Sequence, residues 1–232
     1  DVINDKALCS DFMTMGRELE PAGFLNEDKS FKFAFNKFEK QFESYYGVGV
    51  RLRYLLRVTI LKNYKPKVIE EFDFVVQLPQ SPDDAEDRFE VTPETLTHKL
   101  DVGIEDCLHI EFEYNSQSFH MKDVLKGNVR FKLVRIRIKH MQIDLLRKEI
   151  LGVGSSPITE TETITKFEVM DGCPVKDEEI PVRLYFSGSD VTPSQKNING
   201  KFSVKYFLNL VLVDDDDRRY FKQQEITFWR KK

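Results

Sequence analysis

The sequence has few of the features that mark secreted, membrane-spanning or nucleic-acid-binding proteins. Its 232 residues include only three cysteines, Cys9, Cys107 and Cys173, and their odd number and wide spacing predict neither a disulfide framework nor a zinc knuckle. Lys and Arg number 35 against 39 Asp and Glu, so the basic surplus that general nucleic-acid binding requires is missing. No apolar run reaches the ~20 residues of a transmembrane helix. The composition therefore favours a reducing, cytosolic setting without direct membrane insertion.

Signatures of catalysis and of cofactor binding are also missing from the sequence. It contains no G-x-S-x-G elbow, no G-x-x-x-x-G-K-[ST] loop and no G-x-G-x-x-G fingerprint. None of the four histidines stands beside a Ser or Cys in a turn of the nucleophile-elbow kind. We therefore expect a binding protein rather than an enzyme, with no cofactor and no metal.

One strand-like stretch does place potential metal ligands on one face: Cys107, His109, Glu111 and Glu113. A flat strand spreads such residues at about 3.4 Å per position, so they do not converge on one ion. We expect instead that this outward face pairs with basic residues of a neighbouring strand, such as Arg130 and Lys132.

What the sequence does contain, almost throughout, is alternation of apolar and polar residues. Val50–Lys62 alternates along its whole length, which predicts a long half-buried strand. Shorter runs of the same kind cover residues 72–78, 108–114 and 180–186. The pattern predicts an all-β protein built of two tandem antiparallel β-sandwiches.

Two longer stretches carry more specific information about the strands. Asn128–Ile150 changes phase, which predicts a β-bulge near Leu133-Val134 and a second slip near His140-Met141. Ile158–Val169 alternates Thr with Glu, a composition typical of an exposed or edge strand.

The sequence also predicts a division into domains. Residues 79–99 hold three prolines and a cluster of acids without apolar alternation, so we place a linker there, between an N-terminal sandwich at 1–78 and a C-terminal sandwich at 100–232. Residues 1–78 supply only about four credible strands, whereas a closed sandwich needs about seven. The N-terminal sandwich is therefore expected to be incomplete in this chain.

The most conspicuous charged cluster is the run of four aspartates, Asp214–Asp217, followed by two arginines. It lacks the alternating acids, central Gly and closing Glu of an EF-hand calcium loop. Asp tolerates turn dihedrals, so we expect this run to turn a hairpin between two strands.

Two stretches place apolar residues where a partner could contact them. In Phe167–Pro174, apolar residues run directly into a Gly/Pro turn, and Val169 and Met170 either close the end of the sandwich or serve as contacts. Tyr220-Phe221 follows the acidic turn, where aromatic residues more often belong to the core.

Several stretches resemble the arrestin-like small subunit of retromer, the vacuolar protein sorting-associated protein 26 family. They are GVGVRLRYLLRVT at Gly47–Thr59, VGIEDCLHIEFEY at Val102–Tyr114 and EILGVGSSPITETETITKFEVMDGCPV at Glu149–Val175, together with DRRYFKQQEI near the C-terminus. The resemblance covers nearly the whole chain. It implies the arrestin fold, with a polar contact between two sandwiches. Family members carry further strands before the position of Asp1, so we expect this chain to be a fragment.

The resemblance also implies a non-catalytic role in sorting transmembrane cargo on the cytosolic face of endosomes. The loop Val169, Met170, Asp171 and Gly172 would contact a large α-solenoid subunit, with Met170 as its apolar anchor. Val102 and Phe221 match the positions that bind extended cargo tails beside a sorting nexin. A free-standing arrestin-type adaptor for receptor tails is the alternative.

Overall fold

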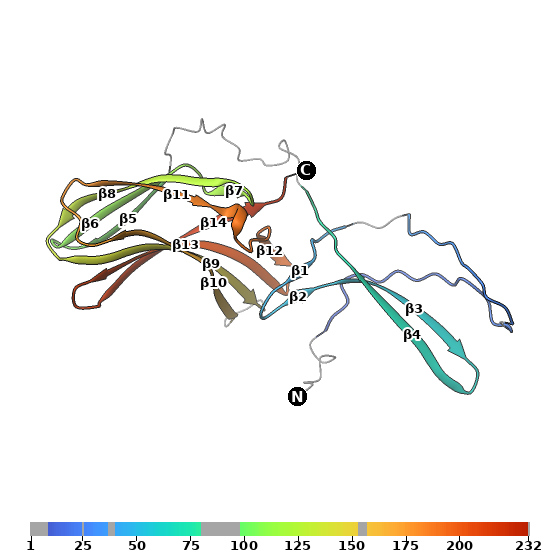
Figure 1. The fold of residues 1–232 in the computed structure, drawn as a ribbon. Helices are drawn as coiled ribbons and strands as arrows, with labels where there is room; N and C mark the ends of the chain where they lie inside the picture. The colour runs from blue at the N-terminus through green and yellow to red at the C-terminus, as the bar shows by residue number, and fades with distance from the viewer. Residues whose placement is uncertain (1–8, 25, 37–39, 80–97, 153–156, 232) are drawn as a thin grey trace. The chain divides into compact units, whose positions relative to one another are not determined.

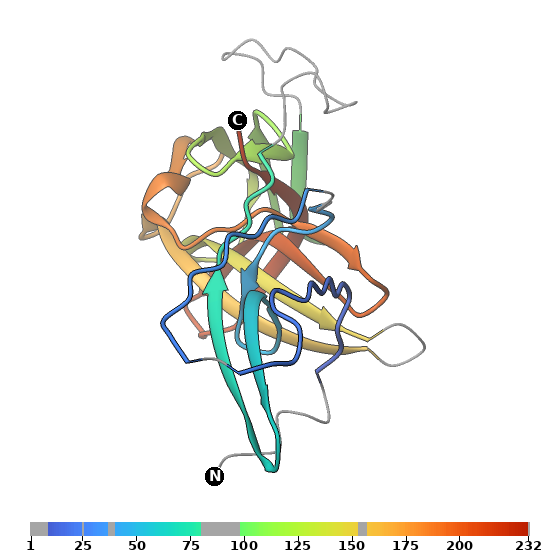
Figure 2. The ribbon, with the colours of Figure 1, turned by 90° about the vertical axis from the view of Figure 1, so that its right-hand side faces the viewer.

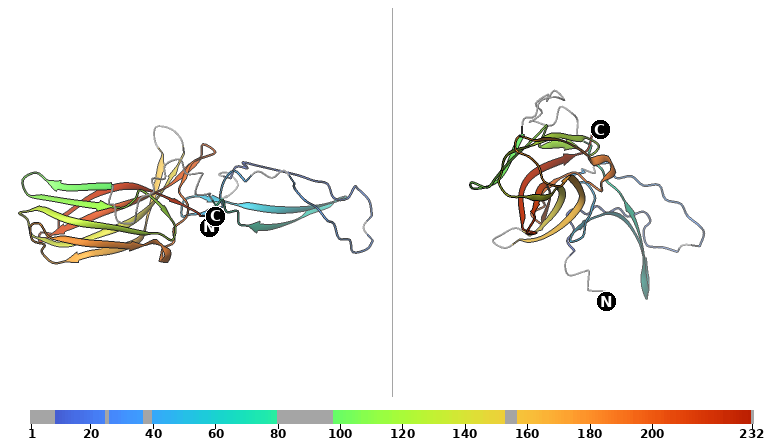
Figure 3. Two further views of the ribbon diagram at one scale, coloured as in Figure 1. Left: turned by 90° about the horizontal axis from the view of Figure 1, so that it is seen from above. Right: turned by 60° about the vertical axis from the view of Figure 1, so that its left-hand side comes forward.

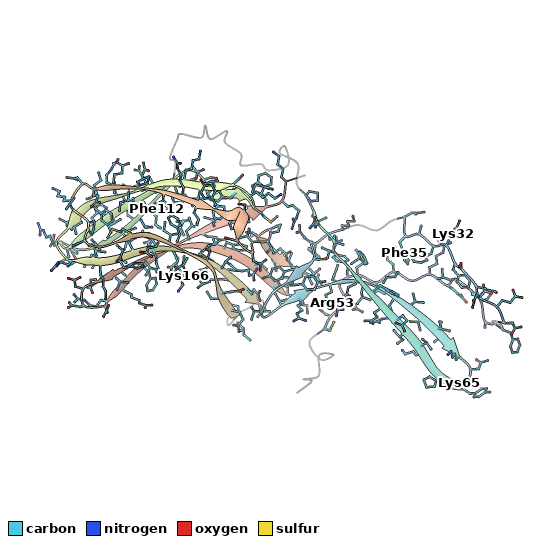
Figure 4. The ribbon with its side chains drawn as sticks, in the orientation of Figure 1. Lys32, Phe35, Arg53, Lys65, Phe112 and Lys166 are labelled. Carbon is cyan, nitrogen blue, oxygen red and sulfur yellow. The ribbon has the colours of Figure 1, made fainter. Side chains whose placement is uncertain are left out.

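The structure, a computed structural model, describes residues 9–24, 26–36, 40–79, 98–152 and 157–231. The chain forms two compact units, Asp1–Gln41 and Phe42–Lys232. The described residues of the first unit contain neither helix nor strand. Its side chains include the ion pair Lys29–Glu20 and the edge-to-face pair of Phe33 and Phe35; Figure 4 labels Phe35 and Lys32 on this segment.

All regular structure in the described residues belongs to the second unit, and it is β-structure apart from the short 3-10 helix Phe186–Gly188. No described helix is long or apolar enough to span a bilayer. The strands are β1 Tyr45–Tyr46, β2 Arg51–Leu52, β3 Tyr54–Lys62, β4 Lys65–Phe74, β5 His98–Ile104, β6 Leu108–Tyr114, β7 Ser118–His120, β8 Val124–Val134, β9 Ile138–Leu151, β10 Ile158–Asp171, β11 Glu179–Tyr185, β12 Gln195–Ile198, β13 Phe202–Asp214 and β14 Arg219–Trp229.

Residues from β5 onward form a β-sandwich of two sheets (Figure 1). One sheet has the order β11-β8-β6-β5; the other has the order β10-β9-β13-β14-β7, with β12 also paired to β13. Figure 3 shows the second sheet curving strongly. Alternate side chains of both sheets point inward, as the period of two predicts. Ile110 and Phe112 of β6 and Leu208 of β13 are fully buried, and Figure 4 shows Phe112 between the two layers.

The predicted register slips are present close to where the sequence places them. Asn128–Ile150 forms two strands, β8 and β9. In the β6–β8 ladder, His109 pairs with Leu133 and Ile110 with Phe131, so Lys132 is the extra residue of a bulge. A second shift lies in the β9–β13 ladder beside His140. Each shift keeps the apolar residues on the core face.

The Thr/Glu stretch is an exposed edge strand, as its composition predicts. β10 is the terminal strand of its sheet in the part of the chain that the structure describes. Its side chains are exposed or half-buried along the whole strand.

The predicted half-buried strand at Val50–Lys62 is wrong in extent. The structure divides this stretch into β2 and β3, and burial ends after Leu52 and Tyr54. Beyond Leu56, the side chains of β3 are exposed on both faces, because the described residues form only the two-stranded ribbon β3–β4 there (Figure 2). With β1 and β2, this region supplies four strands, as predicted.

The predicted linker at 79–99 falls mostly on residues 80–97, which lie outside the described residues. Its last two residues are strand rather than linker, because β5 begins at His98. There, His98 pairs with Tyr114, and the Lys99 ammonium donates to Glu111 at 2.6 Å. The division into domains at 1–78 and 100–232 stays a prediction.

Candidate functional site

The loop predicted to contact a partner lies at the C-terminal end of edge strand β10. The ladder between β9 and β10 shifts between Glu168 and Met170, so Val169 is the extra residue of a β-bulge. Gly172 follows with φ of 123°, a conformation that side chains oppose. Its N–H donates to the Lys139 carbonyl at 2.8 Å, which closes the strand.

Met170 is half-buried, with part of its side chain packed on the sandwich and part open to solvent. It pairs with Met141, whose side chain is fully buried, and it therefore lies on the core side of the sheet. Because β10 is the edge strand, this side chain remains partly open to solvent. Val169 is likewise half-buried, whereas Asp171 and Gly172 are exposed.

Val102 lies in β5 with its side chain directed into the core. The strand alternates, and only 6% of Val102 is exposed. In the described residues β5 ends the four-stranded sheet, so its outer edge has no strand beside it there. Unpaired backbone groups at such an edge are able to accept an added strand. The side chain of Val102 thus belongs to the core beneath this edge.

Phe221 lies in β14, just after the hairpin between β13 and β14, and is 65% exposed. The commoner expectation for an aromatic residue at this place, burial in the core, does not hold. β14 also lies next to β5 of the other sheet. The free edge of β5 and the strand that bears Phe221 thus adjoin where the two sheets meet.

The four aspartates form the predicted hairpin turn, but they are not equivalent. Asp214 is only 2% exposed and belongs to β13. Its carboxylate accepts the backbone N–H groups of Asp216 and Arg218, the Arg218 guanidinium at 2.8 Å and the Tyr220 hydroxyl at 2.8 Å. Burial raises the pKa of Asp214, but these donors outweigh it and the net pKa is lowered. The hairpin thus orders itself around one carboxylate.

The Val169–Gly172 loop and Phe221 lie on different strands of the same sheet. Glu168 pairs with Gln142, Gln142 with Val211, and Val211 with Phe221, so one row crosses four strands. Neighbouring strands are about 4.8 Å apart, which separates the two ends of this row by about 14 Å. The two predicted sites therefore lie on different parts of this sheet.

A buried polar cluster that the sequence did not single out holds the segment before β2 against the sandwich. Glu149 of β9 is 2% exposed. Its carboxylate accepts the Tyr45 hydroxyl at 2.5 Å and the N–H groups of Val48 and Gly49 at 3.0 and 2.6 Å. A Cβ on Gly47 would come within 1.8 Å of this carboxylate. Because Gly47 and Gly49 have no side chains, they leave room for the carboxylate of Glu149, which lies about 100 positions further along the sequence.

The same cluster continues through Arg147, which is 4% exposed. Its guanidinium donates to Glu162 of β10 at 2.7 Å and to the Asp190 carbonyl at 3.3 Å. Burial lowers the pKa of Arg147, but the hydrogen bond to Glu162 together with the interactions with Tyr206 and Tyr45 outweighs burial, so the pKa is raised overall. Burial, reinforced by the hydrogen bond to Glu149, raises the pKa of Tyr45.

A second anchor joins the same segment to the C-terminal strand. Glu43 is 8% exposed, and its carboxylate accepts the Arg230 guanidinium at 2.6 and 3.0 Å and the Leu78 N–H at 3.1 Å. The Gln195 amide donates to the Glu43 carbonyl at 3.3 Å. Sequence reasoning had no signal for these pairs, because their members lie 35 to 187 positions apart.

On the strand face that raised the question of a metal, Glu111 pairs with basic side chains, the expected Lys132 among them. Glu111 is held by Lys99 at 2.6 Å and by Lys132 at 3.6 Å. Arg130 reaches across to Glu179 on β11 rather than to β6. Asp101, His109 and Glu111 do bring ligand atoms within 4.8 Å of one another, but the two ammonium groups already occupy Glu111.

Together, the two packed sheets and their edge strands define an all-β protein of the β-sandwich class. The family model for vacuolar protein sorting-associated protein 26 matches residues 1–217. Proteins of that name from Plasmodium falciparum, Dictyostelium discoideum and Caenorhabditis elegans are 52%, 49% and 48% identical to this chain over its whole length. The chain belongs to the vacuolar protein sorting-associated protein 26 family, a family of protein-sorting components.

The chain matches only part of each relative. It spans 75% of the Plasmodium protein, 64% of the Dictyostelium protein and 62% of the Caenorhabditis protein. Among solved structures, the sporulation control protein Spo0M from Bacillus subtilis shares 14% identity and a TM-score of 0.40 over 52% of this chain and 48% of that chain. That likeness is too slight to support an inference.

Proposed function

We propose that this chain is a non-catalytic subunit of retromer, a coat that sorts transmembrane cargo on the cytosolic face of endosomes. The observation that carries the proposal is the family match over residues 1–217. Retromer sorting requires contacts with a scaffold and with cargo, and the sandwich offers two separate surfaces for them.

The first surface is the loop Val169–Gly172, which would contact the N-terminal end of the large α-solenoid subunit. The bulge at Val169 and the turn at Gly172 present Met170 at a sheet edge, half open to solvent. A thioether adapts to an irregular apolar pocket, which suits an anchor between a strand edge and a helical repeat. Membrane attachment would come from other components of the coat.

The second surface is the outer edge of β5 together with Phe221. A cargo tail in extended form would pair with the β5 backbone beside Val102, and a sorting nexin would hold it from the other side. Backbone pairing supplies affinity without selecting a sequence. The exposed ring of Phe221 supplies selection, because an aromatic residue packs well against an apolar side chain of the tail.

Co-purification separates this proposal from the alternative of a free-standing adaptor. A tagged chain expressed in its native cells should retain a large helical-repeat subunit at one-to-one stoichiometry. An adaptor would retain receptor tails without such a subunit, and that result would replace the retromer assignment.

The cargo surface is tested separately by fluorescence polarisation with a labelled cargo tail, in the presence of a sorting nexin. Phe221→Ala should weaken binding by about 2 kcal/mol, which is roughly 30-fold. The matched control is Tyr185→Ala, because Tyr185 is 59% exposed but lies on β11, at the other edge of the four-stranded sheet. Equal affinity of the two variants would remove Phe221 from the cargo site.

A further inference from the structure

Three side chains near the start of the Val169–Gly172 loop gather on one face of the sheet. They are His140 of β9 and Glu168 and Asp171 of β10, and their ligand atoms lie within 4.8 Å of one another. Asp171 is paired with His140 across the ladder. Glu168 and Asp171 are three positions apart, so in a regular strand they would point to opposite faces.

The bulge at Val169 brings these two carboxylates together. One extra residue changes the phase of a strand, so side chains on either side of it share a face. Glu168 pairs with Gln142 and Asp171 with His140, and these two partners are themselves two positions apart on β9. Both carboxylates therefore lie on the face that carries the imidazole.

A chain of hydrogen bonds orients the imidazole toward the carboxylates. The Gln142 amide group donates to Asp144 Oδ1 at 2.7 Å, and an ionised carboxylate is only able to accept. The Gln142 carbonyl oxygen therefore faces His140 Nε2, at 2.9 Å, and Nε2 must donate. In the neutral ring this leaves the lone pair on Nδ1, the nitrogen that faces Glu168.

The distance between His140 and Glu168 is unsuited to a direct bond. Nδ1 and Oε1 are 4.0 Å apart, which is too long for a hydrogen bond. Zinc binds nitrogen at about 2.0–2.1 Å and carboxylate oxygen at about 2.0–2.2 Å, so tetrahedral ligands lie about 3.4 Å apart. Rotation of the two exposed carboxylates would shorten the distances between the ligand atoms by about 1 Å, to the separation that zinc requires.

We propose that His140 Nδ1, Glu168 and Asp171 bind a divalent transition-metal ion, Zn²⁺ being the probe that fits this nitrogen and oxygen set. The three side chains occupy three positions, and water takes the fourth. Gln142 acts as a positioning residue, because it fixes the tautomer of the ligand. The ion would tie β10 to β9 on both sides of the bulge. The proposal does not depend on the proposed function.

The structure also explains why this triad differs from the one at Asp101, His109 and Glu111. There, Lys99 and Lys132 already neutralise Glu111. Beside the His140 triad, the Lys139 ammonium group attracts Asp171 electrostatically, but it donates its hydrogen bond to Asp217 at 2.9 Å. A metal ion at Asp101, His109 and Glu111 must displace the two lysines from Glu111. At the His140 triad, a metal ion occupies the space between the three ligands.

The test is calorimetric titration of the purified chain with Zn²⁺, with Ca²⁺ and Mg²⁺ as comparison ions. One equivalent of Zn²⁺ should bind, and His140→Ala, Glu168→Gln and Asp171→Asn should each weaken binding at least about tenfold. Gln142→Leu removes no ligand and should weaken it about tenfold as well. Circular dichroism identifies any variant that fails to fold, and Glu168→Gln, on an exposed side chain, then carries the test alone.

Two control variants decide where the ion is bound. His109→Ala alters the competing triad, and Cys173→Ser removes the exposed thiol next to the loop. Both should bind Zn²⁺ as tightly as the parent chain. Loss of binding in either one, or no binding by the parent at free Zn²⁺ up to about 100 μM, would overturn the proposal.

Discussion

The buried carboxylate of Glu149 provides the sharpest test of how residues 42–52 are held to the sandwich. Replacement by Gln keeps the shape of the side chain but exchanges one acceptor oxygen for an amide donor. In the present geometry Oε1 accepts the Tyr45 hydroxyl and the Val48 N–H, and Oε2 accepts the Gly49 N–H at 2.6 Å. In Glu149→Gln, one of these donors therefore faces another donor.

The expected cost follows from these contacts. A hydrogen bond to a charged group contributes about 1.5–3 kcal/mol, and an unpaired buried donor costs about 1–3 kcal/mol. Val48 is 73% exposed, so water is able to relieve part of the loss at the amide groups. We therefore expect Glu149→Gln to lower the free energy of unfolding by about 2–3 kcal/mol.

Urea unfolding measures this loss, and amide hydrogen exchange locates it. The amide of Gly49 should exchange faster in Glu149→Gln, whereas amides in the β6–β8 ladder should change only with global stability. The matched control is Glu225→Gln, a surface glutamate paired with Lys205 at 2.9 Å, which should cost less than about 1 kcal/mol. Equal effects of the two substitutions would refute the anchoring role of Glu149.

Three further predictions concern single residues. Asp214→Asn should lower the stability of the β13–β14 hairpin, measured by amide exchange, whereas Asp216→Asn should not, because only Asp214 is buried among donors; equal effects would contradict this. The raised pKa of Tyr45 means that the folded state keeps a proton that the unfolded state loses above its ordinary pKa of about 10, so the free energy of unfolding should fall as pH rises beyond about 10. Tyr45→Phe should make that fall shallower by about 1.4 kcal/mol per pH unit. An unchanged slope in Tyr45→Phe would contradict this. Gly172→Ala should cost roughly 1 kcal/mol or more in urea unfolding because of the positive φ, unlike Gly188→Ala, and similar costs would argue against the strained turn.

Local alternation was sufficient to predict much of this fold. The edge strand at 158–171, the hairpin at Asp214–Asp217 and the slips in β8 and β9 all follow from residues close in sequence, since the side-chain period of a strand is fixed. Reliance on local alternation also explains why the burial of β3 was predicted wrongly. Alternation shows which face of a strand is apolar, and it does not show whether anything covers that face.

The proposed binding surfaces were only partly predictable from the sequence. The positions of Met170, Val102 and Phe221 came from a family resemblance, and the structure adds that Val102 is buried while Phe221 is exposed. The Glu149 cluster and the His140 triad were missed. Both depend on pairing between distant strands, which no local pattern encodes.

Calorimetry of this chain with a large α-solenoid subunit tests the proposed contact of the Val169–Gly172 loop. The parent chain should bind, and Met170→Asp should not, because a charge in a desolvated contact costs a few kcal/mol. Ile158→Asp is the control, since Ile158 is 64% exposed at the other end of β10, and it should bind like the parent. Unchanged binding by a folded Met170→Asp variant, or no binding by the parent chain, would contradict the claim.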